Sequence, residues 1–539
     1  MNLRIGIDFD NTIVNYDSAF KKIAAQYKYI SKNWDGNKQQ LRNEIIKKDS
    51  VETWKKLQGL VYGKYIYLAK LNEGIEKFLI KSKLINSKIF IVSHKTIYGH
   101  YDKRKILLRK AALDWIKNRN FFIKKLIKKE NIYFEESIEN KVKRINQLKL
   151  NFFIDDLELI LKNKKLNKNI KKILFNELKK KNKNSNIIQH SKWENIDEYI
   201  YGNNNSEVIK NLAEFTSKKK IFKIKKIKGQ KNSQVFKIFF RNRKNGLLKQ
   251  YPNESLDNRK RLIRDFLATK LLKKNNINCV PKPLCSNELF NISIFEWVNG
   301  KKIIQPSNND LNQAINFIQS LKKLSRKKIS SYPYNAVECC KSLKDILIQI
   351  EYKLSNLLNA NTSQKIKKFV NFYFRPAFKN IKSKKISNLY LKPLNSKLQI
   401  LSPSDFGFHN SLKTKKNKII FFDLEYFGKD DPVKLAADFL LHPGMTLNLK
   451  QKKIWISKIT VLFKNDKNFL KRLYLFIPFY ALRWSLIVLN DYKIINVDEY
   501  CKRRKIRKNI FLKSREEQIK KAYYFYNLVK KEEYKKWFN

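Results

Sequence analysis

The chain has 539 residues, of which 43% are hydrophobic and 13% aromatic, and this composition excludes wholesale disorder and predicts two or more folded domains. Its 116 Lys and Arg against 47 Asp and Glu give a formal net charge of +69. The lysines are spread along the whole chain beside Ile and Asn, so we interpret the charge as compositional drift and expect no nucleic-acid partner.

Two further features of the composition narrow the class of protein. The five cysteines and five histidines show no metal-binding spacing, which favours reduced thiols and no zinc site. The chain begins on a strand pattern rather than a secretory leader. The most apolar segment, from Leu473, is interrupted by Pro478 and Arg483, so we expect a buried helix and no transmembrane segment. Together these features predict a cytoplasmic protein.

Residues 1–200 alternate short apolar segments with long amphipathic ones, which predicts an α/β domain with a parallel sheet covered by helices. The expected strands lie in "LRIGIDFD", "KIFIVSH" and "NFFIDDL". Between the first two strands, residues 16–80 have a helical period and predict an inserted helical cap. Polar runs follow, and we expect a linker at residues 201–217.

Polar side chains follow each of these three strands. Asp8 and Asp10 follow the first, Ser93 the second, and Asp155 and Asp156 the third. Ligands of open α/β sheets gather at this edge, and carboxylates from separate strands are typical Mg²⁺ ligands. A carboxylate at such an edge can attack a phosphoryl group while a neighbouring acid protonates the leaving group.

The segments "DFDNT", "IVSH", "ENKVKRI" and "FFIDD" resemble, in order, the four motifs of the haloacid dehalogenase superfamily of phosphohydrolases. The resemblance covers about the first 160 residues and implies a Rossmann-like domain with a Mg²⁺-dependent phosphatase activity. It implies that Asp8 is the nucleophile and Asp10 the general acid/base. It also implies that Thr12, Ser93 and Lys141 bind phosphate, and Lys143 is an alternative to Lys141. The metal ligands that it implies are Asp8, Asp10 and Asp155, and Asp156 is either a further ligand or an orienting group.

From about residue 218 the pattern changes to period-two strands and then to long helical stretches. This change predicts an α+β domain over residues 218–539, with a small β-rich lobe at about 218–300 and a larger helical lobe at about 301–539. Two lobes of this kind can hold a nucleotide in the cleft between them.

The segment "LSPSDFGFHN" and its continuation carry the second set of candidate residues. Asp405 and Asn410 have the D-x-x-x-x-N spacing of a kinase catalytic loop, and Asp423 follows an apolar strand. In phosphoryl transfer such an Asp accepts the substrate's hydroxyl proton, while the Asn and the later Asp hold Mg²⁺ against the ATP phosphates. Lys249 ends a strand and can pair with phosphates, and the loop around Gly229 can cover them.

These residues resemble the aminoglycoside phosphotransferase and choline kinase superfamily, whose fold is similar to that of protein kinases. The resemblance implies ATP as cofactor, a hinge around Glu296 that meets adenine, and an ion pair between Lys249 and Asp265, where the family has Glu. Where the family has His-Gly-Asp at the catalytic aspartate, this sequence has Pro403-Ser404-Asp405. Asp431 and Asp438 resemble the family's structural acids that follow the metal-binding Asp.

The combined prediction is a bifunctional phosphoryl-transfer enzyme that acts on phosphorylated and hydroxylated small molecules. One domain would be a Mg²⁺-dependent phosphatase and the other an ATP-dependent kinase for hydroxyl groups of the sugar or amino-alcohol type. Two alternatives remain open. A nucleic-acid end-processing phosphatase/kinase would need the G-x-x-x-x-G-K-[ST] loop, which the sequence lacks. The other is a nucleotide-binding protein with one degenerate site.

Overall fold

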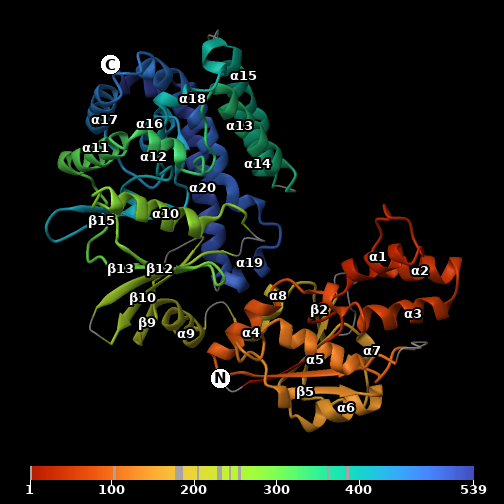
Figure 1. The fold of residues 1–539 in the computed structure, drawn as a ribbon. Helices are drawn as coiled ribbons and strands as arrows, with labels where there is room; N and C mark the ends of the chain where they lie inside the picture. Colours follow the sequence, from red (N-terminus) through yellow and green to blue (C-terminus); the bar gives the residue numbers. More distant parts are fainter. Residues whose placement is uncertain are drawn as a thin grey trace. The chain divides into compact units, whose positions relative to one another are not determined.

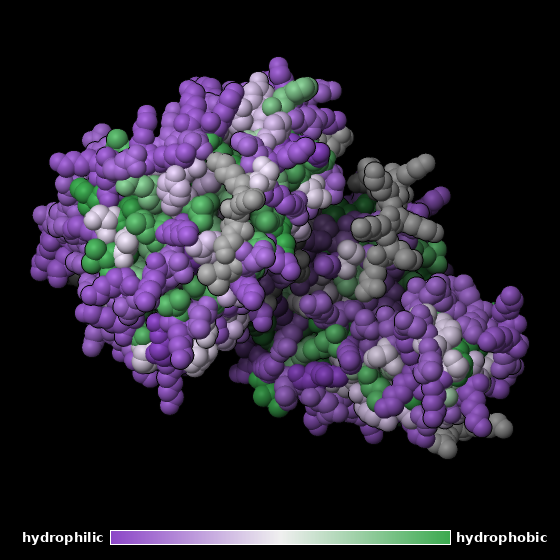
Figure 2. Space-filling view, turned by 90° about the horizontal axis from the view of Figure 1, so that it is seen from above, coloured by the Kyte–Doolittle hydropathy of each residue, from purple (hydrophilic) through white to green (hydrophobic). Residues whose placement is uncertain are grey.

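The computed structural model describes residues 3–100, 105–176, 186–202, 205–227, 233–241, 244–252, 257–360, 363–383, 388–504 and 506–539. The chain divides into two compact units, Met1–Ile224 and Lys225–Asn539. On the face seen in Figure 2, hydrophilic residues cover most of the surface and hydrophobic residues form small, separated areas. This distribution matches lysines that are spread along the sequence rather than gathered in one segment.

In the described part of the first unit, one sheet has six strands, all parallel, in the order β5-β4-β1-β6-β7-β8. The strands are β1 (Arg4–Ile7), β4 (Lys88–His94), β5 (Ile132–Glu135), β6 (Phe152–Asp155), β7 (Lys171–Phe175) and β8 (Ile187–His190). Their apolar runs are buried because helices cover both faces of the sheet. The predicted parallel sheet is therefore confirmed.

Helices α5 and α6 lie on opposite faces of this sheet (Figure 1). On its face, α6 packs Val142 and Ile145 against Phe153 of β6. The helices of the unit are α1 (Asp17–Gln26), α2 (Lys38–Lys48), α3 (Val51–Tyr62), α4 (Ile75–Leu84), α5 (Leu108–Asn118), α6 (Ile138–Gln147), α7 (Glu158–Leu161), α8 (Trp193–Tyr201) and α9 (Ser206–Ser217).

The insert between β1 and β4 consists of α1, α2 and α3, which pack on one another. Phe20 of α1 stacks on Trp54 of α3 with ring centroids 5.2 Å apart. Two short antiparallel strands, β2 (Val14–Asn15) and β3 (Lys70–Leu71), close its base. The cap was predicted to extend to about residue 80, but α4 packs on β4 and belongs to the main layer, so the insert ends near β3.

Residues 201–217 were predicted as a linker, but most of this range, Ser206–Ser217, is helix α9. Helix α9 buries Val208, Ile209 and Leu212 and packs against α4. The polar run before it is the break between α8 and α9, where the side chain of Asn205 caps α9. The linker was predicted from this polar run, and the helical spacing of the apolar residues after it was overlooked.

Among the described residues, the second unit's largest sheet has five strands in the order β12-β13-β11-β10-β9. They are β9 (Ile221–Ile227), β10 (Gln234–Phe240), β11 (Asn245–Gln250), β12 (Pro283–Asn287) and β13 (Ile292–Glu296). In β10, buried positions alternate with half-buried ones from Phe236 on, as the period-two pattern predicts, whereas β13 is buried from Ile292 to Phe295. Helix α10 (Arg261–Lys274) lies between this sheet and the helical part of the unit (Figure 1).

The helical part holds the main core of the second unit and two antiparallel two-stranded sheets. Strand β14 (Ile400–Ser402) pairs with β17 (Gly428–Asp430), and β15 (Ser411–Lys413) pairs with β16 (Ile419–Phe421). The helices are α11 (Asn308–Lys322), α12 (Arg326–Ser331), α13 (Leu343–Leu358), α14 (Gln364–Lys368), α15 (Arg375–Ser383), α16 (Pro432–Leu441), α17 (Leu449–Leu462), α18 (Phe469–Val488), α19 (Val497–Arg504) and α20 (Lys508–Lys530).

Helix α18 lies inside this core, packed against α13, α16 and α20. Within the described chain it belongs to the one segment, Phe469–Lys493, that is long and apolar enough to cross a membrane, and 72% of the apolar window is buried within the fold. Its Arg472 contacts Asp431, and its Arg483 contacts Glu338. These contacts match the predicted buried helix.

Candidate active sites

The first candidate site is built around a buried lysine at the carboxyl edge of the parallel sheet. Lys141 Nζ lies 2.6 Å from Asp8 Oδ1 and 2.7 Å from Asp155 Oδ2. Asp8 follows β1, Asp155 ends the adjacent strand β6, and Lys141 is in the first turns of α6. Three charged groups buried together are tolerated because each is paired. Lys143, on the same helix, is exposed, so the geometry favours Lys141 over its rival.

The acids of this site form a group that suits a divalent cation. Asp8, Asp155 and Asp156 offer carboxylate oxygens within 4.8 Å of one another. Burial raises the pKa of Asp8 well above its usual value, although Lys141 acts against this shift. Burial and the charge of Asp155 raise the pKa of Asp156 to about 7. Hard oxygen ligands with crowded negative charge fit Mg²⁺, which would relieve their repulsion.

Asp10 lies outside this acidic group and has its own partners. Its carboxylate accepts a hydrogen bond of 2.6 Å from Tyr16 Oη and pairs with Lys95 Nζ at 2.9 Å. Sequence reasoning missed both partners, because a tyrosine and one lysine among many carry no signal. Asp10 and Asp8 line the same cavity. The acidic group itself contains Asp156 in place of Asp10, which was predicted as a metal ligand.

The two hydroxyl residues predicted for phosphate binding have different positions. Ser93 is buried at the end of β4 and lines the same cavity as Asp8. Thr12 is fully buried, and its Oγ1 has no hydrogen-bond partner among the described residues. Its carbonyl accepts hydrogen bonds from Asn72 Nδ2 and Trp193 Nε1. The structure therefore brings Ser93, but not the Thr12 side chain, into the cavity.

The cap supplies a further charged group to this site. The cavity has a volume of about 690 Å³ and is lined by both sheet-edge and cap residues. Lys38, at the start of α2, donates a 2.6 Å hydrogen bond to Asn11 Oδ1, and Asn11 in turn donates to Asp156 Oδ2 at 3.0 Å. Burial lowers the pKa of Lys38. The volume suits a small-molecule ligand.

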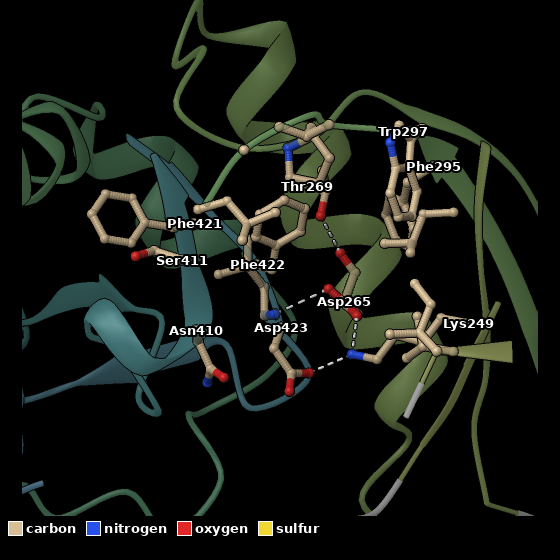
Figure 3. A pocket seen from close by; sticks show the side chains of 18 of the residues that line it. Lys249, Asp265, Thr269, Phe295, Trp297, Asn410, Ser411, Phe421, Phe422 and Asp423 are labelled. Carbon is tan, nitrogen blue, oxygen red and sulfur yellow. Dashed lines mark hydrogen bonds and ion pairs between the residues drawn. The ribbon is translucent and has the colours of Figure 1, made fainter. Parts of the chain in front are cut away.

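The second candidate site is built around another buried lysine, in the second unit. Lys249 of β11 points between Asp265 of α10 and Asp423, which follows β16 (Figure 3). Its Nζ lies 2.8 Å from Asp265 Oδ2 and also contacts Asp423 Oδ1. Asp265 Oδ1 accepts a hydrogen bond of 3.0 Å from Leu424 N. The shorter Asp therefore bonds both the lysine and the loop that carries Asp423.

The charge balance around Lys249 involves a residue that sequence reasoning missed. Burial acts to lower the pKa of Lys249, but the charges of Asp265, Asp423 and Glu425 outweigh it and raise that pKa well above its usual value. Glu425 Oε1 also forms an ion pair with Arg261 Nη1 at 2.9 Å. Glu425 thus connects the loop after β16 to the start of α10.

A cavity of about 420 Å³ is lined by this cluster and by residues of both the sheet and the helical part. Lys249, Asn410 and Asp423 lie toward one part of it and Phe295 and Trp297 toward another (Figure 3). The cavity thus combines a charged end with an apolar one.

Two further residues were predicted to contribute to nucleotide binding, the backbone around Glu296 and Gly229. Glu296 turns away from this cavity, since its carboxylate accepts a 2.8 Å hydrogen bond from Lys282 N. Its neighbours Phe295 and Trp297 line the cavity, so the predicted hinge segment borders it while the Glu296 side chain does not. Gly229 lies outside the described residues.

Asp405 and Asn410 lie close together on the loop between β14 and β15. Asn410 Nδ2 donates to the Asp405 carbonyl at 3.1 Å and to Asp405 Oδ2 at 3.3 Å. The Asn410 carbonyl accepts a 2.8 Å hydrogen bond from Phe422 N, which ties the loop to the segment before Asp423. Ser404, before Asp405, has a left-handed backbone with φ of 64°, a strained conformation often found at functional sites.

Two histidines contact Asp405, and no sequence pattern predicted either contact. His409 Nε2 lies 3.0 Å and His442 Nε2 3.4 Å from Asp405 Oδ1. Burial acts to raise the pKa of Asp405, but the hydrogen bond with His409 and the nearby His442 outweigh it and hold that pKa far below its usual value. Asp405 is therefore ionised under ordinary conditions.

Asp405 opens into a separate cavity of about 580 Å³ in the second unit. Trp484, Tyr426 and Glu338 form part of its walls. Asp438 also lines it, but its carboxylate is bound by Trp484 Nε1 at 2.8 Å and by Lys434 Nζ at 3.0 Å. Asp431 caps α16 by accepting from Val433 N at 2.8 Å. Both acids hold the fold together, as expected from the sequence.

No protein-family model and no curated protein sequence matches the chain. Several solved structures are similar to part of it. A choline kinase from Cryptosporidium parvum Iowa II is 14% identical, with a TM-score of 0.36, over 56% of this chain and 90% of the kinase. A spectinomycin phosphotransferase, solved with ADP and spectinomycin, is 11% identical, with a TM-score of 0.38, over 59% of this chain and 97% of that one.

A macrolide 2′-phosphotransferase from Brachybacterium faecium is 8% identical, with a TM-score of 0.36, over 59% of this chain and 98% of that one. Likenesses with TM-scores of this size do not support an assignment by themselves. The contacts within the chain are therefore the basis for the function proposed below.

Proposed function

We propose that the second unit is an ATP-dependent kinase that phosphorylates a hydroxyl group of a small molecule. The observation that carries the proposal is the arrangement of two cavities around one loop. The first has an apolar part and an end with Lys249 and Asp423, and the second contains Asp405, which is one hydrogen bond from Asn410. An apolar slot that ends in a lysine and paired acids suits a nucleoside triphosphate.

Each group in this arrangement has a role that its contacts support. Lys249 would bind phosphate oxygens, with its amine held in place by Asp265. Asn410 turns Nδ2 toward Asp405, which leaves its Oδ1, together with the Asp423 carboxylate, to hold Mg²⁺. The bound ion would neutralise phosphate charge. Asp405 would take the proton of the acceptor hydroxyl as that oxygen bonds to phosphorus and the bond to ADP breaks.

The direct test is a screen of the purified full chain with Mg²⁺ and ATP against a panel of sugars and amino alcohols, with ADP release as the readout. We expect at least one acceptor to raise ADP release, and we expect Lys249→Met to lose at least about 100-fold of that rate. Lys223→Met, an exposed change on β9, is the matched control. ATP binding without turnover on any acceptor would instead favour a nucleotide-binding protein with a degenerate site.

We further propose that the first unit is a Mg²⁺-dependent phosphatase for small phosphomonoesters. The observation in its favour is the cluster of Lys141, Asp8 and Asp155 beside Asp156, at the bottom of the cavity beneath the cap. Asp8 would attack phosphorus and form an aspartyl phosphate as the ester oxygen leaves, and Asp10 would transfer the proton to that oxygen. Water would then hydrolyse the aspartyl phosphate.

Phosphate release from a panel of phosphorylated metabolites, with Mg²⁺ and with EDTA, tests this second proposal. We expect release only with Mg²⁺. Asp10→Asn should lower turnover while a phosphoryl group accumulates on Asp8, detectable by mass spectrometry. Asp35→Asn, whose side chain is 97% exposed, is the control. Metal-independent release, or a covalent phosphate elsewhere in the chain, would contradict the proposal.

A further inference from the structure

The two histidines at Asp405 form a parallel stack that stands beside both cavities of the second unit. Their ring centroids are 3.5 Å apart and their planes differ by 7°. His409 lines the cavity of Lys249, whereas His442 lines the cavity that contains Asp405. His409 belongs to the loop after β14, and His442 follows the end of α16, so two separate elements meet at one carboxylate oxygen.

The partners of His442 determine which of its nitrogens carries the proton. Gly444 N donates a 3.0 Å hydrogen bond to His442 Nδ1, so that nitrogen must be the unprotonated one. The proton of the neutral ring is therefore on Nε2, the nitrogen that faces Asp405 Oδ1. An edge contact with Trp484, with ring centroids 5.0 Å apart at 83°, holds the ring in this orientation.

His409 donates a hydrogen bond to Asp405 Oδ1, the oxygen that His442 Nε2 faces at 3.4 Å. Its Nε2 lies 3.0 Å from Asp405 Oδ1, and its Nδ1 is buried with no partner among the described residues, so the proton is best placed on Nε2. Two protonated rings at this stacking distance would repel each other, whereas two neutral rings can both donate. Burial also lowers the pKa of His442, which favours its neutral form.

The same three residues bring potential metal ligands within 4.8 Å of one another. A ring nitrogen that carries a proton cannot bind a metal ion, and in His442 that nitrogen is the one turned toward the group. The arrangement therefore fits a carboxylate that accepts two N–H donors better than it fits a metal centre.

We propose that His409 and His442 are positioning residues that saturate Asp405 Oδ1 and leave Oδ2 as the oxygen that accepts the proton of the acceptor hydroxyl. The proposal rests on the proposed kinase function of this unit. Asp405 Oδ2 has one weaker partner, Asn410 Nδ2 at 3.3 Å, and so keeps a lone pair for the substrate. Because both ring nitrogens face one oxygen position, the carboxylate cannot turn out of its present plane without losing these contacts.

The kinetic test uses variants of the full chain and the acceptor, among the sugars and amino alcohols above, that the wild type phosphorylates. His442→Phe keeps a flat ring on His409 but removes the N–H donor. We expect kcat to fall about 10- to 100-fold while KM for ATP changes less than about twofold. His442→Gln, which can donate an amide N–H, should recover part of the loss. His100→Phe, at an exposed position of the other unit, is the control.

An NMR experiment tests the arrangement independently of turnover. The chain has five histidines, so ¹⁵N-histidine labelling gives few signals, and the His409→Gln and His442→Gln variants assign them. We expect His442 to carry its proton on Nε2 and both Nε2 signals to shift in Asp405→Asn. A proton on Nδ1 of His442, or Nε2 signals unmoved by Asp405→Asn, would overturn the proposal. The expected signals with no transfer to any acceptor would leave the arrangement standing and contradict the kinase function.

Discussion

The candidate site of each unit contains a buried lysine between two carboxylates, but the two clusters are built from different kinds of elements. Lys141 lies between acids at the ends of two adjacent, hydrogen-bonded strands, and the three side chains are at most 6% exposed. Lys249 lies between a helix acid and a loop acid, and the Asp423 side chain is 24% exposed. The sheet positions both acids of the first cluster. The acids of the second cluster are positioned by packing between a helix and a loop, and this cluster is open to its cavity.

The largest expected effect comes from removing the lysine of the closed cluster. Lys141→Met leaves Asp8 and Asp155 buried without their cation, which should destabilise the first unit by about 3–5 kcal/mol. Chemical denaturation of the full chain in EDTA measures this loss. Lys143→Met, an exposed change on the same helix, should stay within about 0.5 kcal/mol of wild type. Equal stability of the two variants would show that the buried cluster does not hold the unit together.

A smaller effect is expected at the open cluster, on ligand binding. Asp423→Asn removes a charged group that contacts Lys249 and is placed to hold Mg²⁺, so the affinity for Mg·ATP should fall about 10- to 100-fold. Isothermal titration calorimetry with ATP and Mg²⁺ measures the change. Asp498→Asn, a change to an acid whose side chain is 74% exposed, should bind Mg·ATP like the wild type. Unchanged affinity in Asp423→Asn would remove Asp423 from the proposed metal site.

Glu338 belongs to another ion cluster, with Arg483 and Lys353, whose contribution to stability should depend on pH. Burial acts to raise the pKa of Glu338, but Arg483 and Lys353 outweigh it and lower that pKa from 4.5 to about 2. The ionised form therefore stabilises the fold above about pH 4.5, and this contribution is lost as the pH falls toward 2. Because the side chain is 38% exposed, solvent screening reduces the expected effect of Glu338→Gln to about 1 kcal/mol.

Melting temperatures of wild type and Glu338→Gln between pH 7 and pH 3.5 test this prediction. The difference should be constant from pH 7 to about pH 5 and should shrink below about pH 4.5. A difference that grows as the pH falls would have the wrong sign. The result also separates a cluster that only stabilises the fold from the two clusters proposed to bind phosphate.

The two clusters also differ in how far the sequence predicted them. Asp8, Ser93 and Asp155 were predicted because each follows an apolar strand, and a parallel sheet brings such ends to one edge. The choice between Lys141 and Lys143 needed the structure, which shows the face of α6 that is buried.

Other parts of the fold and sites were beyond the sequence for identifiable reasons. His409 and His442 are far apart in the chain, and Lys38 and Lys95 carry no signal in a chain with 116 Lys and Arg. Thr12 was expected in the first cavity, but its side chain is buried away from it. Helix α9 was missed because a short polar run precedes it, and tertiary packing against α4 decides its structure.

If the two units carry separate activities, each activity can be removed without the other. Phosphate release from a phosphorylated metabolite and ADP release with an acceptor are measured in the full chain for wild type, Asp8→Asn and Asp405→Asn. We expect Asp8→Asn to lose only phosphate release and Asp405→Asn to lose only acceptor-dependent ADP release, each by at least about 1000-fold. Loss of both activities in either variant, in a chain that is still folded, would contradict the separation of the two activities.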